Sequence, residues 1–182
     1  MQILYVPERQ HWLTVGCIDG DLQIYDSMLS GSKLTRSVEL QIASIFAPVT
    51  QDETLVATLV PVQQQVGAAD CGLFAAAFAF HAAKGDNLRK LHFDQSRMRS
   101  HLIQCFEKQK PEGFPLLTSK PHQVKRAKLA HCVIHLLCKC RMPDVYDTKM
   151  VACDSCDKWF HYKCVGLRKR AKLSMWICQT CS

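Results

Sequence analysis

The C-terminal part of the chain carries eight side chains that can bind a metal ion. They form four close pairs, Cys-x-Cys, Cys-x-x-Cys, His-x-x-Cys and Cys-x-x-Cys, made by Cys138, Cys140, Cys153, Cys156, His161, Cys164, Cys178 and Cys181. Each spacing lets two side chains reach one tetrahedral Zn²⁺ at about 2.0–2.3 Å, and four such ligands complete a structural site. The pattern therefore predicts two structural zinc ions.

A second set of reactive residues lies nearer the N-terminus. It consists of His11, Asp26 and, in the segment Gln63–Phe74, Cys71 at the start of an apolar run. A thiol becomes an effective nucleophile when a base is at hand and its thiolate is stabilised, for example at a helix N-terminus. These residues could form a nucleophile–base–orienter triad. The alternative is that Cys71 and His11 only fill space in a core.

The proposed triad requires a hairpin and a helix to position it. Residues 11–17 and 22–26 are strand-like, and the turn sequence Ile18–Asp21 lies between them, so a β-hairpin is predicted. If the turn is at Asp19–Gly20, His11 and Asp26 lie within a residue or two of being opposite each other.

Other segments are predicted from the periodicity of their apolar residues. The nearly all-apolar run 71–83 follows Asp70 and predicts a buried helix with an acidic residue at its start. Residues 38–46 have helical periodicity, and residues 54–62 are rich in strand-forming types. Residues 93–109 predict an amphipathic helix, with one side formed by Leu102, Cys105 and Phe106.

Composition limits the class of protein. Hydrophobic residues make up 48% and charged residues 21%, which is typical of a soluble globular protein. No window reaches the roughly 18 apolar residues of a membrane helix, and the N-terminus lacks the pattern of a secretory signal. Without such a signal, the clustering of eight of the eleven cysteines after residue 131 favours metal binding over disulfides.

The C-terminal pattern of four Cys, one His and three Cys resembles the plant homeodomain (PHD) finger. Met150, Asp154, Trp159 and Trp176 stand where that family carries the same residues. The resemblance implies interleaved ligation, in which Cys138, Cys140, His161 and Cys164 hold one ion and Cys153, Cys156, Cys178 and Cys181 hold the other. A RING finger is the rival, but it usually opens with Cys-x-x-Cys.

PHD fingers commonly bind histone tails, so the resemblance also implies a histone or other peptide as partner. Met150 and Trp159 occupy the positions of a methyl-lysine cage, where cation–π attraction contributes roughly 1–2 kcal/mol. Asp144 and Tyr146 lie in the loop that supplies another wall. Leu137 departs from the family, because many readers carry an aromatic residue there. The alternative is that Trp159 is a scaffold residue. Trp176 is expected to be a core residue and not a contact residue.

The N-terminal motifs together resemble the ubiquitin-like-protein (SUMO-type) cysteine proteases over residues 1–108. By this resemblance Cys71 is the nucleophile, His11 the base, Asp26 the orienter and Gln65 the oxyanion donor, while Trp12 covers a substrate that ends in Gly-Gly. The family carries a sizeable segment before its catalytic His, whereas ten residues precede His11 here. The resemblance therefore implies an incomplete core, and a catalytically inert remnant is the rival interpretation.

The predicted fold class is α+β: an incomplete papain-like protease core (1–108), a basic linker (109–134) and a small cross-braced two-zinc finger (135–182). Residues 1–109 have a net charge of −2 and residues 110–182 a net charge of +9. Basic runs at 120–129 and 167–172, beside a finger type used on chromatin, favour a nuclear protein. The expected partners are a peptide tail and a ubiquitin-like substrate, with no membrane and no sequence-specific nucleic acid.

Overall fold

The computed structural model describes residues 1–28, 33–118, 128–144, 149–168 and 175–182. Contacts between residues divide the chain into two units. The first unit comprises residues 1–37 and 56–132, and the second comprises residues 38–55 and 133–182. In the described part, no helix is long and apolar enough to cross a membrane.

The first unit contains a sheet that begins with two antiparallel pairs. β1 (Gln2–Val6) pairs with β2 (His11–Ile18), and β2 pairs with β3 (Asp21–Tyr25). β3 is followed in the sheet by the parallel strand β4 (Thr54–Leu59) and then by β5 (Ala130–His135). Residues 54–55 and 133–135 of these two strands are assigned to the second unit. A short 3-10 turn, η1 (Pro7–Arg9), joins β1 to β2.

The predicted hairpin is confirmed, including its turn. Asp19 and Gly20 both have positive φ, 51° and 86°, as a two-residue turn of this hand requires. The resulting register pairs Thr14 with Tyr25, which places His11 and Asp26 two residues from being directly opposite.

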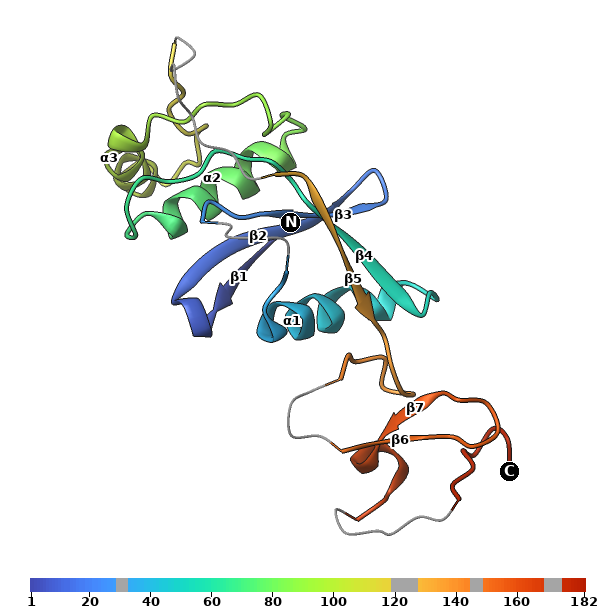
Figure 1. Cartoon of the computed structure of the whole chain (residues 1–182). Helices are drawn as coiled ribbons and strands as arrows, with labels where there is room; N and C mark the ends of the chain where they lie inside the picture. The colour runs from blue at the N-terminus through green and yellow to red at the C-terminus, as the bar shows by residue number, and fades with distance from the viewer. Residues whose placement is uncertain (29–32, 119–127, 145–148, 169–174) are drawn as a thin grey trace. The chain divides into compact units, whose positions relative to one another are not determined.

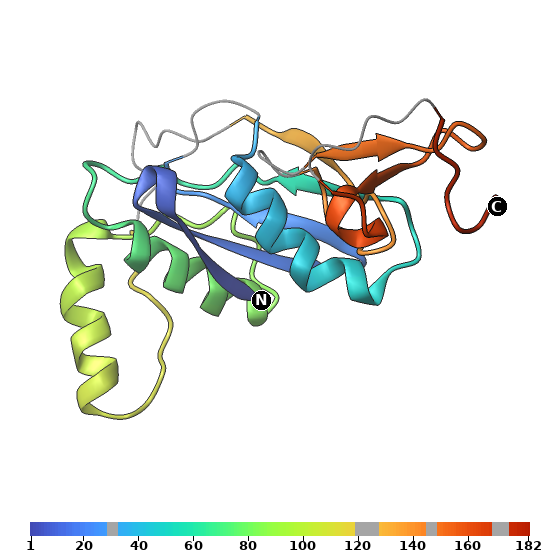
Figure 2. The ribbon, with the colours of Figure 1, turned by 90° about the horizontal axis from the view of Figure 1, so that it is seen from below.

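The predicted helices are also present. α2 (Cys71–Ala83) lies against β1 and β2, and α3 (Gln95–Glu107) lies beside α2 at the edge of the unit (Figures 1 and 2). The core gathers around α2, where Phe74, Phe78 and Phe93 meet with ring centroids 5.7–6.2 Å apart. α2 is buried on nearly every side, so its own side chains are apolar all round the helix and not on one face alone.

The apolar side of α3 is less covered than its sequence suggests. Met98 is its fully buried residue, whereas Leu102, Cys105 and Phe106 line an apolar cavity of about 370 Å³ together with Phe80. The predicted face therefore exists, but a cavity rather than a packed layer adjoins it.

Part of the predicted linker belongs to the folded unit. Phe114 is buried in the core, and its N–H donates to His81 Nε2 at 3.1 Å. Leu116 bridges Phe93, and β5 starts at Ala130. The segment 111–117 has no regular apolar spacing, so periodicity alone did not reveal it. Most of the basic run 120–129 lies outside the described residues.

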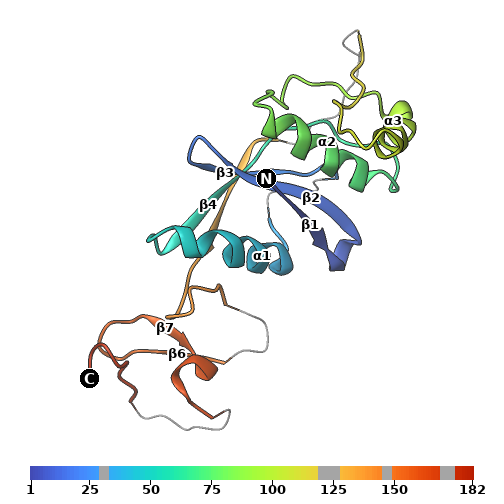
Figure 3. The ribbon, with the colours of Figure 1, turned by 180° about the vertical axis from the view of Figure 1, so that it is seen from behind.

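The second unit contains α1 (from Val38 of Arg36–Phe46), the 3-10 turn η2 (Ala47–Val49) and the C-terminal zinc-binding region. In that region β6 (Met150–Ala152) and β7 (Trp159–His161) form an antiparallel pair, seen side by side in Figure 3, and η3 (Tyr162–Val165) follows β7.

The position of Phe78 in the core predicts its effect on stability. Replacing it with Ala removes a fully buried ring and leaves a cavity, so we expect the free energy of unfolding in urea to fall by about 3–5 kcal/mol. Val66→Ala removes an exposed side chain and is the control, with a change within about 0.5 kcal/mol. A loss below about 1 kcal/mol for Phe78→Ala would contradict the assigned core.

Candidate metal centre and candidate active site

Two groups of four ligand atoms lie close together in the C-terminal unit. One comprises Cys138, Cys140, His161 and Cys164, and the other comprises Cys153, Cys156, Cys178 and Cys181. Within each group, all four ligand atoms lie within 4.8 Å of one another. These are the two interleaved groups that were predicted, so the cross-braced arrangement is confirmed.

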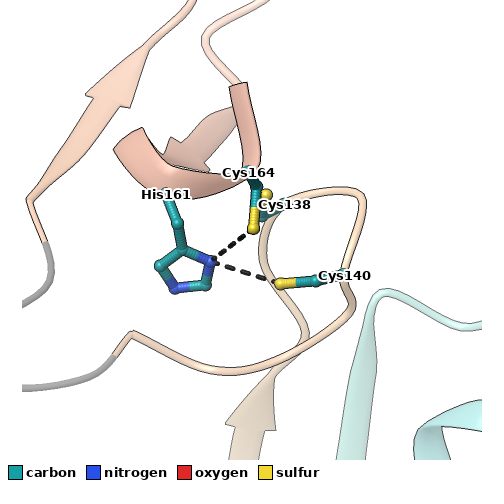
Figure 4. Close-up of side chains that lie close together, drawn as sticks. All are labelled: Cys138, Cys140, His161 and Cys164. Carbon is teal, nitrogen blue, oxygen red and sulfur yellow. Dashed lines mark hydrogen bonds between the residues drawn. The ribbon is translucent and has the colours of Figure 1, made fainter. Parts of the chain in front are cut away.

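The distances within each group suit a tetrahedral zinc site. Four sulfur atoms about 2.3 Å from one ion stand about 3.8 Å apart, and the Sγ atoms of Cys156 and Cys178 are 3.9 Å apart. In the other group, the Nδ1 atom of His161 lies 3.3 Å from Cys140 Sγ and 4.0 Å from Cys164 Sγ. Figure 4 shows this ring nitrogen turned toward the thiols. Each group can therefore hold a zinc ion.

The closeness of the thiols favours the binding of a cation. The backbone N–H of Cys178 lies 3.2 Å from Cys153 Sγ and lowers the pKa of Cys153 to about 6. The backbone N–H of Lys158 acts in the same direction on Cys156, but burial and the neighbouring thiols raise the pKa of Cys156 to about 12. Without a cation these thiols cannot all ionise, whereas bound zinc stabilises each thiolate directly.

Local backbone geometry turns the ligand pairs toward their ions. Cys138, Arg141 and Asp157 have positive φ values of 63°, 56° and 57°, which non-glycine residues adopt rarely. The N–H of Arg141 donates to Cys138 O, and the N–H of Asp157 donates to Cys153 O, so each ligand pair is followed by a tight turn. Sequence reasoning did not find these strained positions because none is glycine.

Trp176 ties the second ligand group together. The backbone N–H of Trp176 donates to Asp154 Oδ2 at 2.6 Å, and the backbone carbonyl of Trp176 accepts from the backbone N–H of Asp154. The indole packs edge-on against Phe160 with ring centroids 5.4 Å apart. The half-buried Trp176 thus acts as a packing residue, in the role that its sequence position suggested.

In the N-terminal unit, His11 and Asp26 form a buried pair. His11 Nε2 lies 2.6 Å from Asp26 Oδ1, and the two side chains are 2% and 1% exposed. His11 is the first residue of β2, and Asp26 directly follows β3, so the hairpin brings them together. His11 Nδ1 is buried and has no hydrogen-bond partner among the described residues.

Asp26 is held by more groups than the sequence indicated. Its Oδ2 accepts from Arg9 Nη1 at 2.8 Å, and its Oδ1 also accepts from the N–H of Met28 at 2.7 Å. Burial alone would raise the pKa of Asp26, but the hydrogen bond and charge of His11, the Met28 N–H and the Arg9 charge together lower it. The Asp26 carboxylate is therefore kept ionised and oriented toward His11.

Cys71 is the first residue of α2 and is buried. Thr14 of β2 donates to Ala75 O in α2 at 2.7 Å, and a Cβ on Gly72 would lie 3.7 Å from the Trp12 ring. The start of β2, which carries His11, therefore runs beside the start of α2, which carries Cys71.

Trp12 follows His11 in β2, and Gln65 is hydrogen-bonded to Ser27, the residue after Asp26. Trp12 is 42% exposed and stacks on Tyr5 with ring centroids 4.8 Å apart. Gln65 accepts from Ser27 Oγ at 2.7 Å and donates one amide N–H to Gly67 O at 2.9 Å. The contribution of Tyr5 was missed by the sequence analysis, although its place opposite Trp12 follows from the β1–β2 pairing.

Comparison with known proteins bears on the C-terminal region. Residues 138–181 match the PHD-finger family. The chain is 39% and 37% identical, over 51 residues each, to the chromatin remodeling proteins EBS and SHL of Arabidopsis thaliana. It is 36% identical over 50 residues to histone lysine demethylase PHF8 of Danio rerio.

Residues 138–181 form a PHD finger. The matched segments cover 27%, 27% and 26% of this chain, and 22%, 22% and 5% of the EBS, SHL and PHF8 relatives. The chain thus spans about a fifth of the length of the first two. The family match does not extend to the region of His11 and Cys71, and none of the three named relatives is a peptidase by name.

Two of the predicted peptide-binding residues lie on one face of the β6–β7 sheet. Trp159 is 50% exposed and pairs with Ala152 across the β6–β7 sheet, while Met150 pairs with His161. Because alternate residues of a strand share a face, Met150 and Trp159 belong to the same face of this sheet. Asp144 is exposed, and Tyr146 lies outside the described residues.

A cavity of about 590 Å³ is lined in part by Trp159 and by its neighbour Phe160. Its wall includes Trp159 and Leu137 of the finger together with Glu53. Glu53 also pairs with Lys158 Nζ at 2.8 Å.

Upstream of the finger, His131 forms a hydrogen bond with Thr58 Oγ1. In the described part of the chain, neither His131, Cys132 nor His135 joins a ligand group.

The two ligand groups predict the metal content and its dependence on pH. Purified protein should contain about two zinc equivalents by elemental analysis, and Cys153→Ser should remove about one and increase amide exchange across β6 and β7. Because zinc binds thiolates, acid should release the metal as pH falls. The control is Cys17→Ser, an exposed cysteine outside both groups, which should retain both ions. Full metal content in Cys153→Ser would contradict the site.

Proposed function

We propose that the PHD finger binds a histone tail and that the protein works on chromatin in the nucleus. The observation that carries the proposal is the exposed Trp159 beside Met150 on a hairpin held by two zinc-binding groups. The chromatin names of the EBS and SHL relatives and the histone demethylase name of PHF8 support it.

The proposed mode of binding follows from the β6–β7 hairpin. This sheet has two strands, so β6 has one edge that β7 does not cover. A peptide can add there as a third strand through backbone hydrogen bonds, with side-chain pockets supplying specificity. A lysine cation of the peptide would lie over the face of Trp159, with Met150 beside it. The exposed Asp144 would supply negative charge.

Trp159 should therefore contribute to binding of a methylated histone peptide. In a calorimetric titration with a trimethyl-lysine peptide, Trp159→Ala should weaken binding about 5- to 30-fold, since cation–π attraction contributes about 1–2 kcal/mol. Trp12→Ala is the matched control, because Trp12 is similarly exposed but lies in the other unit. Equal affinity of the intact protein for methylated and unmodified peptides would refute the cage.

We propose a second function for the N-terminal unit, that of a cysteine peptidase acting on a ubiquitin-like protein after Gly-Gly. The specific observation in its favour is the buried His11–Asp26 pair beside the helix that begins with Cys71. The other ring nitrogen of His11, Nδ1, has no hydrogen-bond partner among the described residues. A catalytically inert remnant attached to a PHD finger is the competing proposal. The comparisons support the PHD finger that both proposals share.

The chemistry of the proposed peptidase uses residues of this chain alone. The Cys71 thiolate would attack the carbonyl carbon of the second glycine of Gly-Gly, while Asp26 holds the imidazole of His11 in place. His11, having taken the proton of the Cys71 thiol, would give it to the leaving amine. It would then take a proton from the water that hydrolyses the thioester, so that release of the acid restores the Cys71 thiolate beside a protonated His11. A Gln65 amide N–H and the backbone N–H of Cys71 would donate to the oxyanion, and Trp12 would cover the narrow Gly-Gly stem.

A mechanism-based probe distinguishes the two proposals. A ubiquitin-like protein ending in a Gly-Gly vinyl sulfone should label the intact chain, and Cys71→Ala should abolish the labelling seen by mass spectrometry. Asp26→Asn should slow it by several orders of magnitude, as expected when the orienting carboxylate is lost. Cys17→Ser is the matched control and should label at the normal rate. No labelling of the intact chain would refute peptidase activity and leave the inert remnant.

A further inference from the structure

Asp70 lies directly before α2 but does not act as its cap. Aspartate at this position usually accepts from the N–H groups of the second or third helical residue. Here Asp70 is the N-cap residue of α2 by position, yet its side chain makes no capping hydrogen bond. The backbone carbonyl of Asp70 still accepts the first helical bond, from Phe74, at 3.0 Å.

The Asp70 carboxylate is instead held by α3. Gln95, the first residue of α3, donates from Nε2 to Asp70 Oδ2 at 2.7 Å. One turn further along the same helix, Arg99 Nη2 lies 2.7 Å from Asp70 Oδ1. Each carboxylate oxygen therefore has a donor from α3, and neither bonds an N–H at the start of α2.

Gln95 also fixes the loop that leads into α2. Its Oε1 accepts from the Val66 N–H at 2.9 Å, and its Nε2 donates to the Val66 carbonyl at 2.8 Å. The side chain thus pairs with the backbone of Val66 as a neighbouring strand would. The Val66 side chain itself is 82% exposed, so the loop is held through its backbone and not by apolar packing.

The consequence falls on the N-terminus of α2. The N–H groups of Gly72 and Leu73 are left without a side-chain acceptor from Asp70. His11, with its buried and unpartnered Nδ1, lies at the start of β2, which runs beside this helix end. A carboxylate turned onto those N–H groups would neutralise the positive end of the helix and repel an anion there.

We propose that Gln95 is a positioning residue of the candidate peptidase site. With Arg99, it holds the negative charge of Asp70 away from the N-terminus of α2, so that the helix N–H groups stay open to the Cys71 thiolate and to the oxyanion. This role rests on the proposed peptidase function, but the placement of Asp70 can be tested without catalysis.

The test replaces Gln95 with Ala in the zinc-loaded full chain. Freed from Gln95, Asp70 should cap α2, so hydrogen exchange at Gly72 and Leu73 should slow about tenfold. Alkylation of Cys71 by iodoacetamide, followed by mass spectrometry of its peptide, should slow about tenfold, because a nearby carboxylate disfavours the thiolate. Gln104→Ala, an exposed glutamine of the same helix, is the control and should change neither rate.

The double variant Gln95→Ala/Asp70→Ala separates positioning from simple structural support. Removing the carboxylate should return both the exchange and the alkylation to rates near those of the intact chain. If Gln95 only stabilises the fold, the double variant will be no better than Gln95→Ala. Either that result, or unchanged exchange in Gln95→Ala, would overturn the proposal. Failure of the Gly-Gly probe to label the intact chain, with these rates as expected, would refute the peptidase alone.

Discussion

The PHD finger depends on the crowding of thiols that cannot all ionise unless a cation is bound. Burial and the neighbouring thiols, among them Cys178 with its Sγ 3.9 Å from Cys156 Sγ, raise the pKa of Cys156 to about 12. A zinc ion turns that repulsion into coordination, and its binding free energy becomes folding free energy. β6 and β7 have three residues each, so metal coordination, and not a large apolar core, holds Trp159 in its exposed position.

The N-terminal unit solves the positioning problem differently. Its apolar core around Phe74 and Phe78 fixes α2 against the sheet, and polar side chains are then placed at the edge of that core. Asp26 shows how such a buried charged group is stabilised. Burial disfavours its charge, yet donors from His11, Arg9 and Met28 compensate, so the carboxylate stays ionised in a nearly dry place. A buried ion held in this way constrains the imidazole of His11.

Much of this arrangement could be predicted from local sequence signals. The Asp19–Gly20 turn indicated the hairpin register, the apolar run indicated α2, and the ligand spacing indicated eight zinc ligands. The division of these ligands into two interleaved groups came from the resemblance to PHD fingers. Long-range polar contacts were not predictable, because Arg9 reaches Asp26 and Gln95 reaches Val66 only after the chain has folded. The strand β5 and the buried Phe114 escaped for a related reason, since their partners are distant in sequence.

Asp70 departs from the usual role of an aspartate that stands directly before a helix. A capping aspartate contributes about 1 kcal/mol, whereas an ion pair with the exposed Arg99 contributes about 0–1 kcal/mol. The hydrogen bond from Gln95 Nε2 adds to this ion pair, so holding Asp70 at the side of α3 replaces the capping contribution. The two arrangements differ in where the negative charge lies. Here it lies at the side of α3, whereas a capping aspartate would place it at the N–H groups beside Cys71. Departures of this kind are expected where a fold is shaped by function, and this one lies one residue before the candidate nucleophile.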